Sequence, residues 1–520
     1  MVSDDLAVVN ARMLTMEPTH PIVEAALVRR GRIALVGTTR EVLDAADRVP
    51  VYDCGGRVVV PGFIDAHCHL EMTCLAATRC VACHTPPMKS LSEIAEALRR
   101  KVAETPPGQW VIGRSSFTLH AKVAEGRMFT RQDLDAITER HPLLVFSGFH
   151  VAMLNTLGMK ELGLWDRTDN PPRGVTINKD DSGAPTGVVT EIWDLLPAFS
   201  AEDTRDALKS KVKELFVSQG VTTAYTIPFS SDDIRSIQGL QAAGEFPLRI
   251  RLYYHVPHLV SLDSLLATGL QTGFGNDMLR FGGVKIFVDG TGHDGYGNRL
   301  LDFKWTQQEL NDFVARAHQD GLQLLMHVST IPSIQMAATA VEEAVRKAPT
   351  PHRHRIEHGA DNVQSLEDMR RLRDLGIGLV ATPQFIYSAG DSSGRRPPKF
   401  TRLRTLLDEG FEVIGASDST GTVPDGIAPL FNIACAAVRR TVGGKIMTPE
   451  ERITAEEGLK MFTIWAAKSG FEEADKGSIA VGKLGDFAVL SADPLQADAE
   501  ELYDIQVEAT ILGGQVVYER

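Results

Sequence analysis

The sequence predicts an α/β protein: a (β/α)8 TIM barrel, with a β-sandwich module formed from both termini and a subdomain inserted after the first barrel strand. Three observations predict this architecture. Short apolar segments alternate with helical segments through the middle of the chain, as in a parallel sheet. Eight of these segments have the composition of buried strands. At both ends of the chain, strand-like segments are separated by glycine turns, without helices of comparable length between them.

The first predicted barrel strand ends at His67. The other seven are Gly220–Tyr225, Pro247–Tyr253, Gly283–Phe287, Leu322–His327, Arg353–His358, Gly376–Ala381 and Glu412–Ser417. From the second strand onward, their spacing is close to that of one strand–helix unit. Parallel strands of this number close into a barrel whose reactive groups lie at the carboxyl ends of the strands.

Three parts of the chain are expected. The β-sandwich module is assigned to residues 1–60 and 475–520, and the barrel to residues 61–70 and 211–474. The stretch between the first two barrel strands is far too long for one crossover connection. Residues 71–210 are therefore predicted to form an inserted α/β subdomain over the barrel mouth.

Composition excludes several classes of partner. The formal net charge is −13, whereas nucleic-acid and anionic-membrane binding need basic patches. No apolar run approaches the roughly 18–20 residues that span a bilayer, and the first residues lack the basic segment of a secretory signal. We expect a cytoplasmic protein with a small-molecule substrate. Exposed strands in the terminal module also suggest a homo-oligomer.

His67, Cys68 and His69 form the most informative motif, because they end the first predicted strand. Alternate residues of a strand point to the same side, so both imidazoles face one way and Cys68 faces the other. Two neutral imidazole nitrogens directed at one point suit a divalent metal such as zinc. Taken alone, the motif has a simpler explanation as two hydrogen-bonded histidines at a strand end.

Other chemically active residues end the remaining strands. Lys285 lies in the fourth strand, His327 and His358 end the fifth and sixth, and Asp418 follows the eighth. Singly, a buried lysine is usually an ion-pair partner and a strand-end aspartate is often a helix cap. Together on one barrel rim, they predict a site for one or two divalent metals per chain, with zinc favoured.

The chemistry expected of such a site is hydrolysis. A bound metal lets a water molecule ionise near neutral pH and act as a nucleophile. Asp418 is assigned as the catalytic residue, because a carboxylate beside that water can accept its proton and return it to the leaving group. As an ammonium group Lys285 would repel a metal, so it must lose its proton or be converted to an anion.

These residues carry a resemblance to a known family. Val60–His69 resembles the signature of the amidohydrolase superfamily at the end of the first barrel strand, and the whole chain resembles the YtcJ-like branch, which includes N-substituted formamide deformylases. Further matching segments are Gly187–Glu191, Gly283–Gly290, Arg355–His358, Gly415–Asp418 and Gly482–Leu490. The resemblance implies one or two metals bound by His67, His69, His327 and His358. It also implies a carboxylated Lys285 that bridges them and a proton shuttle at Asp418.

Three residues are candidate substrate-binding groups. His150 lies in a segment that resembles the branch, although Phe149 stands where the branch usually has a glycine or another small residue. Glu191 ends the matching segment that begins at Gly187. His293 lies in a glycine-rich loop after the fourth strand, whose backbone can approach a ligand closely; a loop without a binding role is the alternative.

The predicted function is hydrolysis of a carbon–nitrogen bond in a small amide, such as an N-substituted formamide or an acyl amide. Hydrolysis of a carbamate, urea, ester or cyclic amide stays open. Deamination of a ring is disfavoured, because such enzymes usually carry a glutamate three residues after the fifth-strand histidine and this chain has Thr330 there. A non-catalytic barrel scaffold is a remote alternative, since no predicted metal ligand is missing.

Overall fold

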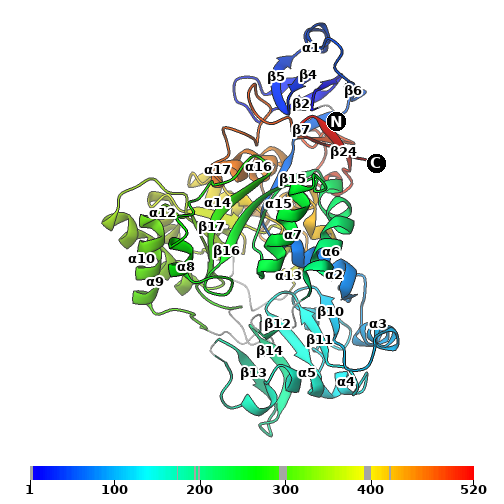
Figure 1. Cartoon of the computed structure of the whole chain (residues 1–520), viewed down its shortest axis with the longest axis vertical. Coiled ribbons are helices and arrows are strands. Elements are labelled where there is room, and N and C mark those ends of the chain that lie inside the picture. The colour runs from blue at the N-terminus through cyan, green and yellow to red at the C-terminus, as the bar shows by residue number, and fades with distance from the viewer. Residues whose placement is uncertain are drawn as a thin grey trace.

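The computed structural model of the chain describes residues 4–172, 174–192, 195–196, 199–291, 301–391, 400–420 and 423–520. Along the longest axis of the molecule, the strands of both termini lie at one end and the barrel lies in the middle (Figure 1). A sheet formed within residues 81–190 lies at the other end (Figure 1). Among the described residues, no helix combines the length and apolarity needed to cross a membrane.

Eight parallel strands form a nearly closed barrel and confirm the predicted fold class. In sheet order they are β8 (Phe63–Cys68), β15 (Val221–Thr226), β16 (Arg249–His255), β17 (Leu279–Phe287), β18 (Leu324–His327), β19 (Arg355–Glu357), β20 (Gly378–Ala381) and β21 (Ile414–Gly415). Strands that follow one another in this series are neighbours in the sheet, which is the usual result of repeated strand–helix units.

Residues that directly follow β21 bond to β8 and link the two ends of the barrel sheet. The backbone N–H of Asp418 donates to the carbonyl oxygen of His67 at 2.9 Å. The backbone N–H of Ser417 donates to Asp65 Oδ1 at 3.0 Å, and the Ser417 hydroxyl donates to the second carboxylate oxygen of Asp65. Burial raises the pKa of Asp65 to about 7, although these hydrogen bonds oppose the rise. The closure thus depends on a carboxylate that sits inside the barrel wall.

Helices surround the barrel (Figure 1). They are α2 (Leu70–Arg79), α6 (Ala201–Leu215), α7 (Ser231–Ala242), α8 (Leu262–Leu266), α9 (Gln307–Gln319), α10 (Ile331–Lys347), α11 (Gly359–Asn362), α12 (Leu366–Asp374), α13 (Gln384–Ala389), α14 (Leu403–Asp408), α15 (Pro429–Val438), α16 (Ala455–Met461) and α17 (Ile464–Ser469). The short helices α11 and α13 lie beside His358 at the barrel mouth. Several begin at capping boxes: Ser230 starts α7 and Thr306 starts α9, each accepting a hydrogen bond from the backbone three residues later.

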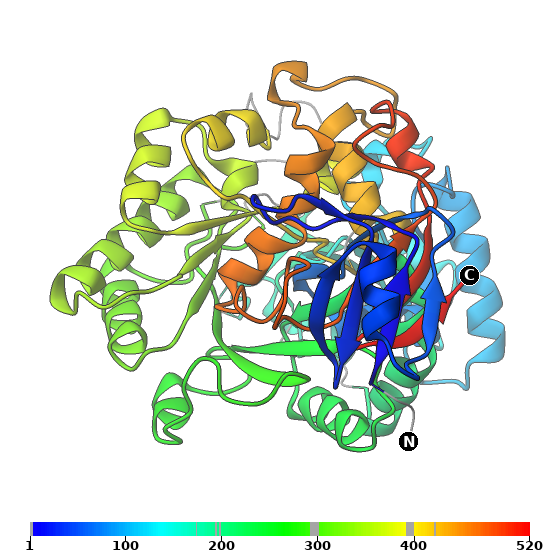
Figure 2. The same cartoon turned by 90° about the horizontal axis from the view of Figure 1, so that it is seen from above.

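The two termini build a pair of sheets that share one apolar core. The four-stranded sheet has the order β5 (Arg32–Gly37), β4 (Ala25–Arg29), β1 (Leu6–Val9) and β6 (Val51–Asp53). The six-stranded sheet has the order β24 (Gln515–Glu519), β23 (Val507–Leu512), β22 (Phe487–Leu490), β7 (Val58–Pro61), β2 (Arg12–Leu14) and β3 (Ile22–Val23). Val8 and Val28 of the first sheet share a buried cluster with Val59 and Phe487 of the second. Strands from opposite chain ends thus lie side by side (Figure 2).

The third sheet lies between α2 and α6 in the chain. Its order is β13 (Thr176–Lys179), β14 (Pro185–Thr190), β12 (Val151–Leu154), β11 (Leu143–Ser147), β10 (Val111–Ser115) and β9 (Val81–Ala82). Three helices accompany it: α3 (Leu91–Glu104), α4 (Arg131–Asp135) and α5 (Thr156–Glu161). The turn between β11 and β12 brings Phe149 against His69 at the barrel mouth. The exact domain boundaries expected from the sequence stay a prediction.

A cluster of three histidines lies at the amino-terminal ends of β18 and β19. The backbone N–H of Leu324 donates to His354 Nδ1 at 3.1 Å. His354 Nε2 lies 3.0 Å from His318 Nδ1, and His318 Nε2 lies 2.8 Å from the carbonyl oxygen of Ala348. Neutral imidazoles with their protons on Nε2 satisfy all three bonds together. His352 stacks on His354, and burial lowers the pKa of His352 to about 4 and that of His354 well below its usual value.

We expect acid to destabilise the protein through this cluster. In the unfolded chain an imidazole titrates near pH 6.5, so the unfolded state binds more protons than the folded state below that pH. The free energy of unfolding should therefore fall as the pH drops from about 6.5 toward 4. Urea unfolding of the wild type and of His352→Gln between about pH 6.5 and 4 measures this fall in the free energy of unfolding. The variant should lose less stability on acidification than the wild type does. Equal losses would show that protonation of His352 does not destabilise the protein.

Candidate metal centre

The predicted metal ligands converge at the carboxyl ends of the barrel strands. His67 lies on β8 and His69 directly after it, while His358 follows β19 and Asp418 follows β21. One ligand atom from each of His67, His358 and Asp418 lies within 4.8 Å of the other two. His69 Nε2 lies 3.4 Å from Asp418 Oδ1. All four side chains are buried, so they form one dry cluster at the barrel mouth.

The backbone is strained at this cluster. His358 and Asp418 have φ angles of 62° and 47°, in the left-handed region that costs a residue with a side chain roughly 1–2 kcal/mol. The side-chain amide of Asn362 donates to the His358 carbonyl at 3.0 Å, and the Asp418 N–H is bonded to β8. Such strain persists where the surroundings fix it, and it is typical of functional sites. At His358 it lets two successive side chains, those of Glu357 and His358, enter the barrel interior.

The protonation states suit metal binding. Burial, with a smaller contribution from the charge of Lys285, lowers the pKa of His67 to about 3, and burial lowers that of His69. Burial acts to raise the pKa of Asp418. The hydrogen bond with His69 and the neighbouring rings of His358 and His67 outweigh burial and hold that pKa below its usual range. Neutral imidazoles and an ionised carboxylate are the forms that coordinate a metal.

Lys285 lies on β17 and is fully buried. Its Nζ atom has no hydrogen-bond partner among the described residues and lies 5.1 Å from the centre of the Phe287 ring. Burial lowers its pKa to about 8, although Glu357 and Asp418 oppose the change. A buried amine without a partner costs free energy, and its neutral form is the one that reacts with carbon dioxide. The position is thus suited to the predicted carboxylation, which stays a prediction.

His327 lies beside the cluster but faces another group. Its ring centre is 5.0 Å from that of His358. Its Nε2 lies 3.1 Å from Ser329 Oγ and 3.9 Å from Asp289 Oδ1. Asp289 accepts a hydrogen bond from the Ser329 backbone N–H at 2.8 Å. The structure therefore brings His327 to the mouth, whereas the compact group of three ligand atoms consists of His67, His358 and Asp418.

A buried ion pair stands behind His67. His67 Nδ1 lies 2.6 Å from Glu357 Oε2. Glu357 also accepts hydrogen bonds from Arg355 Nε at 3.0 Å and Nη2 at 3.1 Å. Burial acts to raise the pKa of Glu357, but Arg355 and His67 outweigh it and hold that pKa below its usual range. His67 Nδ1 thus lies against an ionised carboxylate, without the alignment of a regular hydrogen bond, and His67 Nε2 lies 3.8 Å from Asp418 Oδ1.

The inserted sheet adds a second pair of residues to the mouth. His150 Nδ1 lies 3.0 and 3.1 Å from the two carboxylate oxygens of Glu191. The His150 ring centre is 5.1 Å from that of His327. Phe149, the unusual residue of this segment, stacks on His69 with ring centres 4.5 Å apart. The predicted substrate-binding groups His150 and Glu191 thus lie together at the mouth, and His293 lies outside the described residues.

A cavity of about 730 Å³ opens beside these residues. We call it the mouth cavity; its lining includes Glu191, His255, His258, Phe287, Lys304 and Trp305. The Phe287 ring centre lies 4.7 Å from that of His327, so the cavity adjoins the candidate metal ligands. Its volume falls in the range of cavities that bind small molecules, and its aromatic walls with a few polar groups are typical of them.

The sequence analysis did not assign roles to Asp65, Asp289 or Glu357. Asp65 and Asp289 are ionisable residues that follow apolar residues of predicted strands. Such a residue must be paired when the strand is buried, and this signal could have singled them out. Glu357 lies two residues after Arg355 on a predicted strand, so alternation could have paired these two. The partners Ser417 and Ser329 could be identified only in the structure.

The arrangement fits a divalent metal. Ring nitrogens of His67 and His358 and a carboxylate oxygen of Asp418 lie within 4.8 Å of one another. Lys285, whose Nζ has no hydrogen-bond partner among the described residues, lies close enough to lower the pKa of His67. Mixed nitrogen and oxygen donors suit zinc and similar transition metals, whereas magnesium and calcium prefer oxygen alone.

Comparison with known proteins adds independent findings. The model of the amidohydrolase family matches residues 50–518. An N-substituted formamide deformylase of Arthrobacter pascens is 31% identical, over 99% of this chain and 98% of that protein. YtcJ of Bacillus subtilis, which carries an amidohydrolase name, is 25% identical over 89% of this chain and 90% of its own. A metal-dependent hydrolase structure from Pyrococcus horikoshii has a TM-score of 0.73 at 20% identity, covering 95% of this chain and 99% of its own.

We expect Lys285→Met to raise stability while impairing metal binding. Methionine fills a similar volume without a buried amine, so the free energy of unfolding should rise by about 1–2 kcal/mol. If the lysine contributes to the centre, the divalent metal retained after purification should fall. Urea unfolding of the metal-free protein and elemental analysis check the two effects separately. Unchanged metal content would contradict a role for Lys285 in the centre.

Proposed function

The chain belongs to the amidohydrolase family and is a hydrolase of carbon–nitrogen bonds; we propose that its substrate is a small amide, either an N-substituted formamide or an acyl amide. The observation that carries the proposal is the buried cluster of His67, His358 and Asp418, whose ligand atoms lie within 4.8 Å of one another. Support for an amide comes from the relative named for N-substituted formamides, which matches along almost the whole chain.

We assign the metal to His67, His69, His327, His358 and Lys285. A divalent metal, with zinc favoured by the imidazole donors, would supply a water of lowered pKa and polarise the amide carbonyl. His67 and His358 place ring nitrogens beside Asp418, and His69 Nε2 lies 3.4 Å from the same carboxylate. For His327 to join them, its Nε2 has to turn from Ser329 toward His358.

Asp418 is the proposed proton-transfer group. Its carboxylate is ionised and lies among the metal ligands, so it can accept the proton that the attacking water releases. The water oxygen forms a bond with the carbonyl carbon, the carbon–nitrogen bond breaks, and Asp418 passes the proton to the departing nitrogen. The products are a carboxylic acid and an amine, and Asp418 ends in its starting state.

His150 and Glu191 are proposed to orient the substrate. Glu191 holds His150 through Nδ1, which directs the other ring nitrogen away from that carboxylate. The Glu191 backbone is left-handed, with φ 58°, and its carboxylate also accepts the Thr291 N–H at 2.8 Å. The pair is therefore rigid. The mouth cavity beside it offers room for the substituent that the amide nitrogen or acyl group carries.

The substrate class can be tested by a screen of the metal-loaded protein. It should contain N-substituted formamides, acyl amides, carbamates, ureas, esters, cyclic amides and amino-substituted rings. We expect the formamides and acyl amides to show the highest kcat/KM. A carbamate, ester or ring deamination with a higher value would replace the amide assignment.

Asp418→Asn should lower kcat by about 10²–10⁴-fold on any accepted amide, because the variant cannot take up the proton of the attacking water. Steady-state kinetics with the metal-loaded variant measure the effect. Asp263→Asn is a matched control, since that carboxylate is exposed and pairs with Arg316 at the surface. Full turnover by Asp418→Asn would remove the carboxylate from the mechanism.

A further inference from the structure

A line of buried side chains joins the metal centre to the opposite end of the barrel. It runs from His67 through Glu357 to Arg355, with 2.6 Å between His67 Nδ1 and Glu357 Oε2. Arg355 also donates through Nη2 to the carbonyl oxygen of Ala66 at 2.7 Å. One guanidinium therefore holds both the carboxylate that faces His67 and the backbone immediately before His67.

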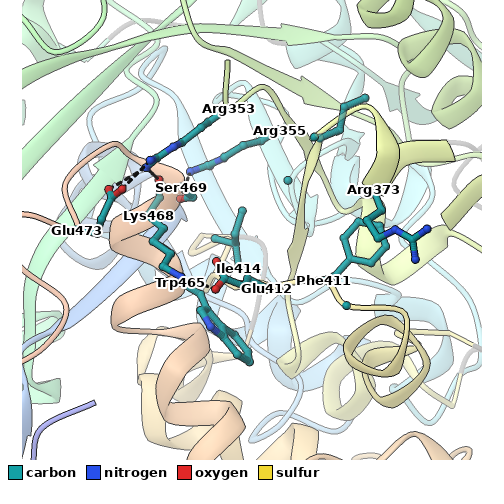
Figure 3. Close-up of a pocket in the computed structure, with 14 residues that line it drawn as sticks. Arg353, Arg355, Arg373, Phe411, Glu412, Ile414, Trp465, Lys468, Ser469 and Glu473 are labelled. Carbon is teal, nitrogen blue, oxygen red and sulfur yellow. Dashed lines mark hydrogen bonds and ion pairs between the residues drawn. The ribbon is translucent and has the colours of Figure 1, made fainter. Parts of the chain in front are cut away.

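The far end of this line borders a second cavity. We call it the base cavity; it has a volume of about 510 Å³, and its lining includes Arg353, Arg355, Ile414, Trp465, Ser469 and Glu473 (Figure 3). Arg355 Nη1 donates to Ser469 Oγ at 3.2 Å on its wall. Arg353 lies on the same wall but pairs with Glu473, at 2.8 and 2.6 Å (Figure 3).

We propose that Glu357 and Arg355 are positioning residues of the metal centre: together they hold His67 in the tautomer whose Nε2 is free to bind the metal. Arg355 is fully buried and is among the residues that border the base cavity. The assignment rests on the metal centre proposed above and does not depend on which amide is the substrate.

The tautomer argument follows from the contacts. A neutral imidazole carries one proton, on either nitrogen. We place that proton on Nδ1, because Glu357 Oε2 lies 2.6 Å from this atom, although the ring is not aligned for a regular hydrogen bond with it. The Nε2 lone pair then faces Asp418 and His358. Carboxylates that hold metal-binding histidines in this way typically change metal affinity by about 10–100-fold when they are removed.

Arg355 is needed because the carboxylate is fully buried. Without a cation beside it, Glu357 would have to take up a proton or remain as an unpaired charge in the barrel interior, and either change weakens its hold on His67. Arg355 is the guanidinium that bonds both oxygens of Glu357, at 3.0 and 3.1 Å. Arg355 therefore stabilises Glu357 both by its positive charge and by two hydrogen bonds that fix the carboxylate.

Metal affinity, measured by competition with a chelator, tests the role of Glu357. We expect Glu357→Gln to lose about 10–100-fold in affinity, while Glu357→Asp, which keeps the charge, should recover part of the loss. Arg353→Ala is the matched control: it removes a guanidinium from the same cavity wall but leaves Glu357 paired, so its affinity should equal that of the wild type. Circular dichroism and urea unfolding establish that each variant is folded.

Chemical rescue tests the role of Arg355, and it also tests whether a small cation can reach the position of its guanidinium through the base cavity. Arg355→Ala should bind the metal more weakly, and added guanidinium ion should restore affinity at concentrations far below those that unfold the protein. Urea has nearly the same shape without the charge and should not restore it. Glu357→Gln should show no rescue, because its defect lies beyond the guanidinium. If Arg355→Ala does not fold, Arg355→Lys should show a smaller loss of affinity than Glu357→Gln.

Several results would overturn the proposal. Wild-type affinity in Glu357→Gln, an equal loss in Arg353→Ala, or equal rescue by urea and guanidinium would each show that the pair only fills space. A wild-type protein that binds no divalent metal would remove the metal centre itself. Failure of the amide screen alone would change the substrate and leave this inference intact, because binding is measured and not turnover.

Discussion

The closure of the barrel between β8 and β21 is the interaction on which the site depends. Asp65 and Ser417 are 352 residues apart in sequence, and their hydrogen bonds join the first strand to the last. The bond from the Asp418 N–H to the His67 carbonyl lies one step further along the same seam. The proposed base and a proposed ligand are therefore adjacent only because the sheet closes there. An open sheet with the same strands would leave them on opposite edges.

A dry interior imposes the second constraint, because every charge inside the barrel needs a partner. Glu357 meets this need with Arg355, and Glu191 with His150. Lys285 is an exception among the described residues: it is fully buried, and its Nζ has no hydrogen-bond partner. Local rules of stability are commonly broken where a protein binds or reacts. The proposed role of Lys285 in the metal centre would account for this unpaired amine.

The barrel carries the proposed metal ligands, while the inserted sheet and the residues beside its strands carry groups that contact them. Phe149 stacks on His69, and His150 lies over His327 while held by Glu191. The mouth cavity is lined by residues that follow β16 and β17 together with Glu191 of the inserted segment. The proposed substrate cavity is therefore formed by strand ends and by the connections that follow them, where barrels carry their functional variety.

The sequence by itself determined the fold class and the rim on which the site lies. Alternating strand and helix patterns located the eight barrel strands, because buried strands are short and apolar and the connecting helices are amphipathic. The histidine pair at His67 and His69 was readable because alternate strand residues share a face. Lys285, His327 and Asp418 were placed on the same rim because parallel strands all end at one side of a barrel.

Only the tertiary structure decided which of these groups meet and what holds them. The sequence could not show that Glu357 faces His67, since that contact joins β19 to β8 across the barrel interior. It could not show that His327 faces Asp289, nor that Phe149 covers His69. Periodicity specifies the direction of a side chain relative to its own strand. Contacts between distant strands depend on register, closure and side-chain rotamers, which no local pattern encodes.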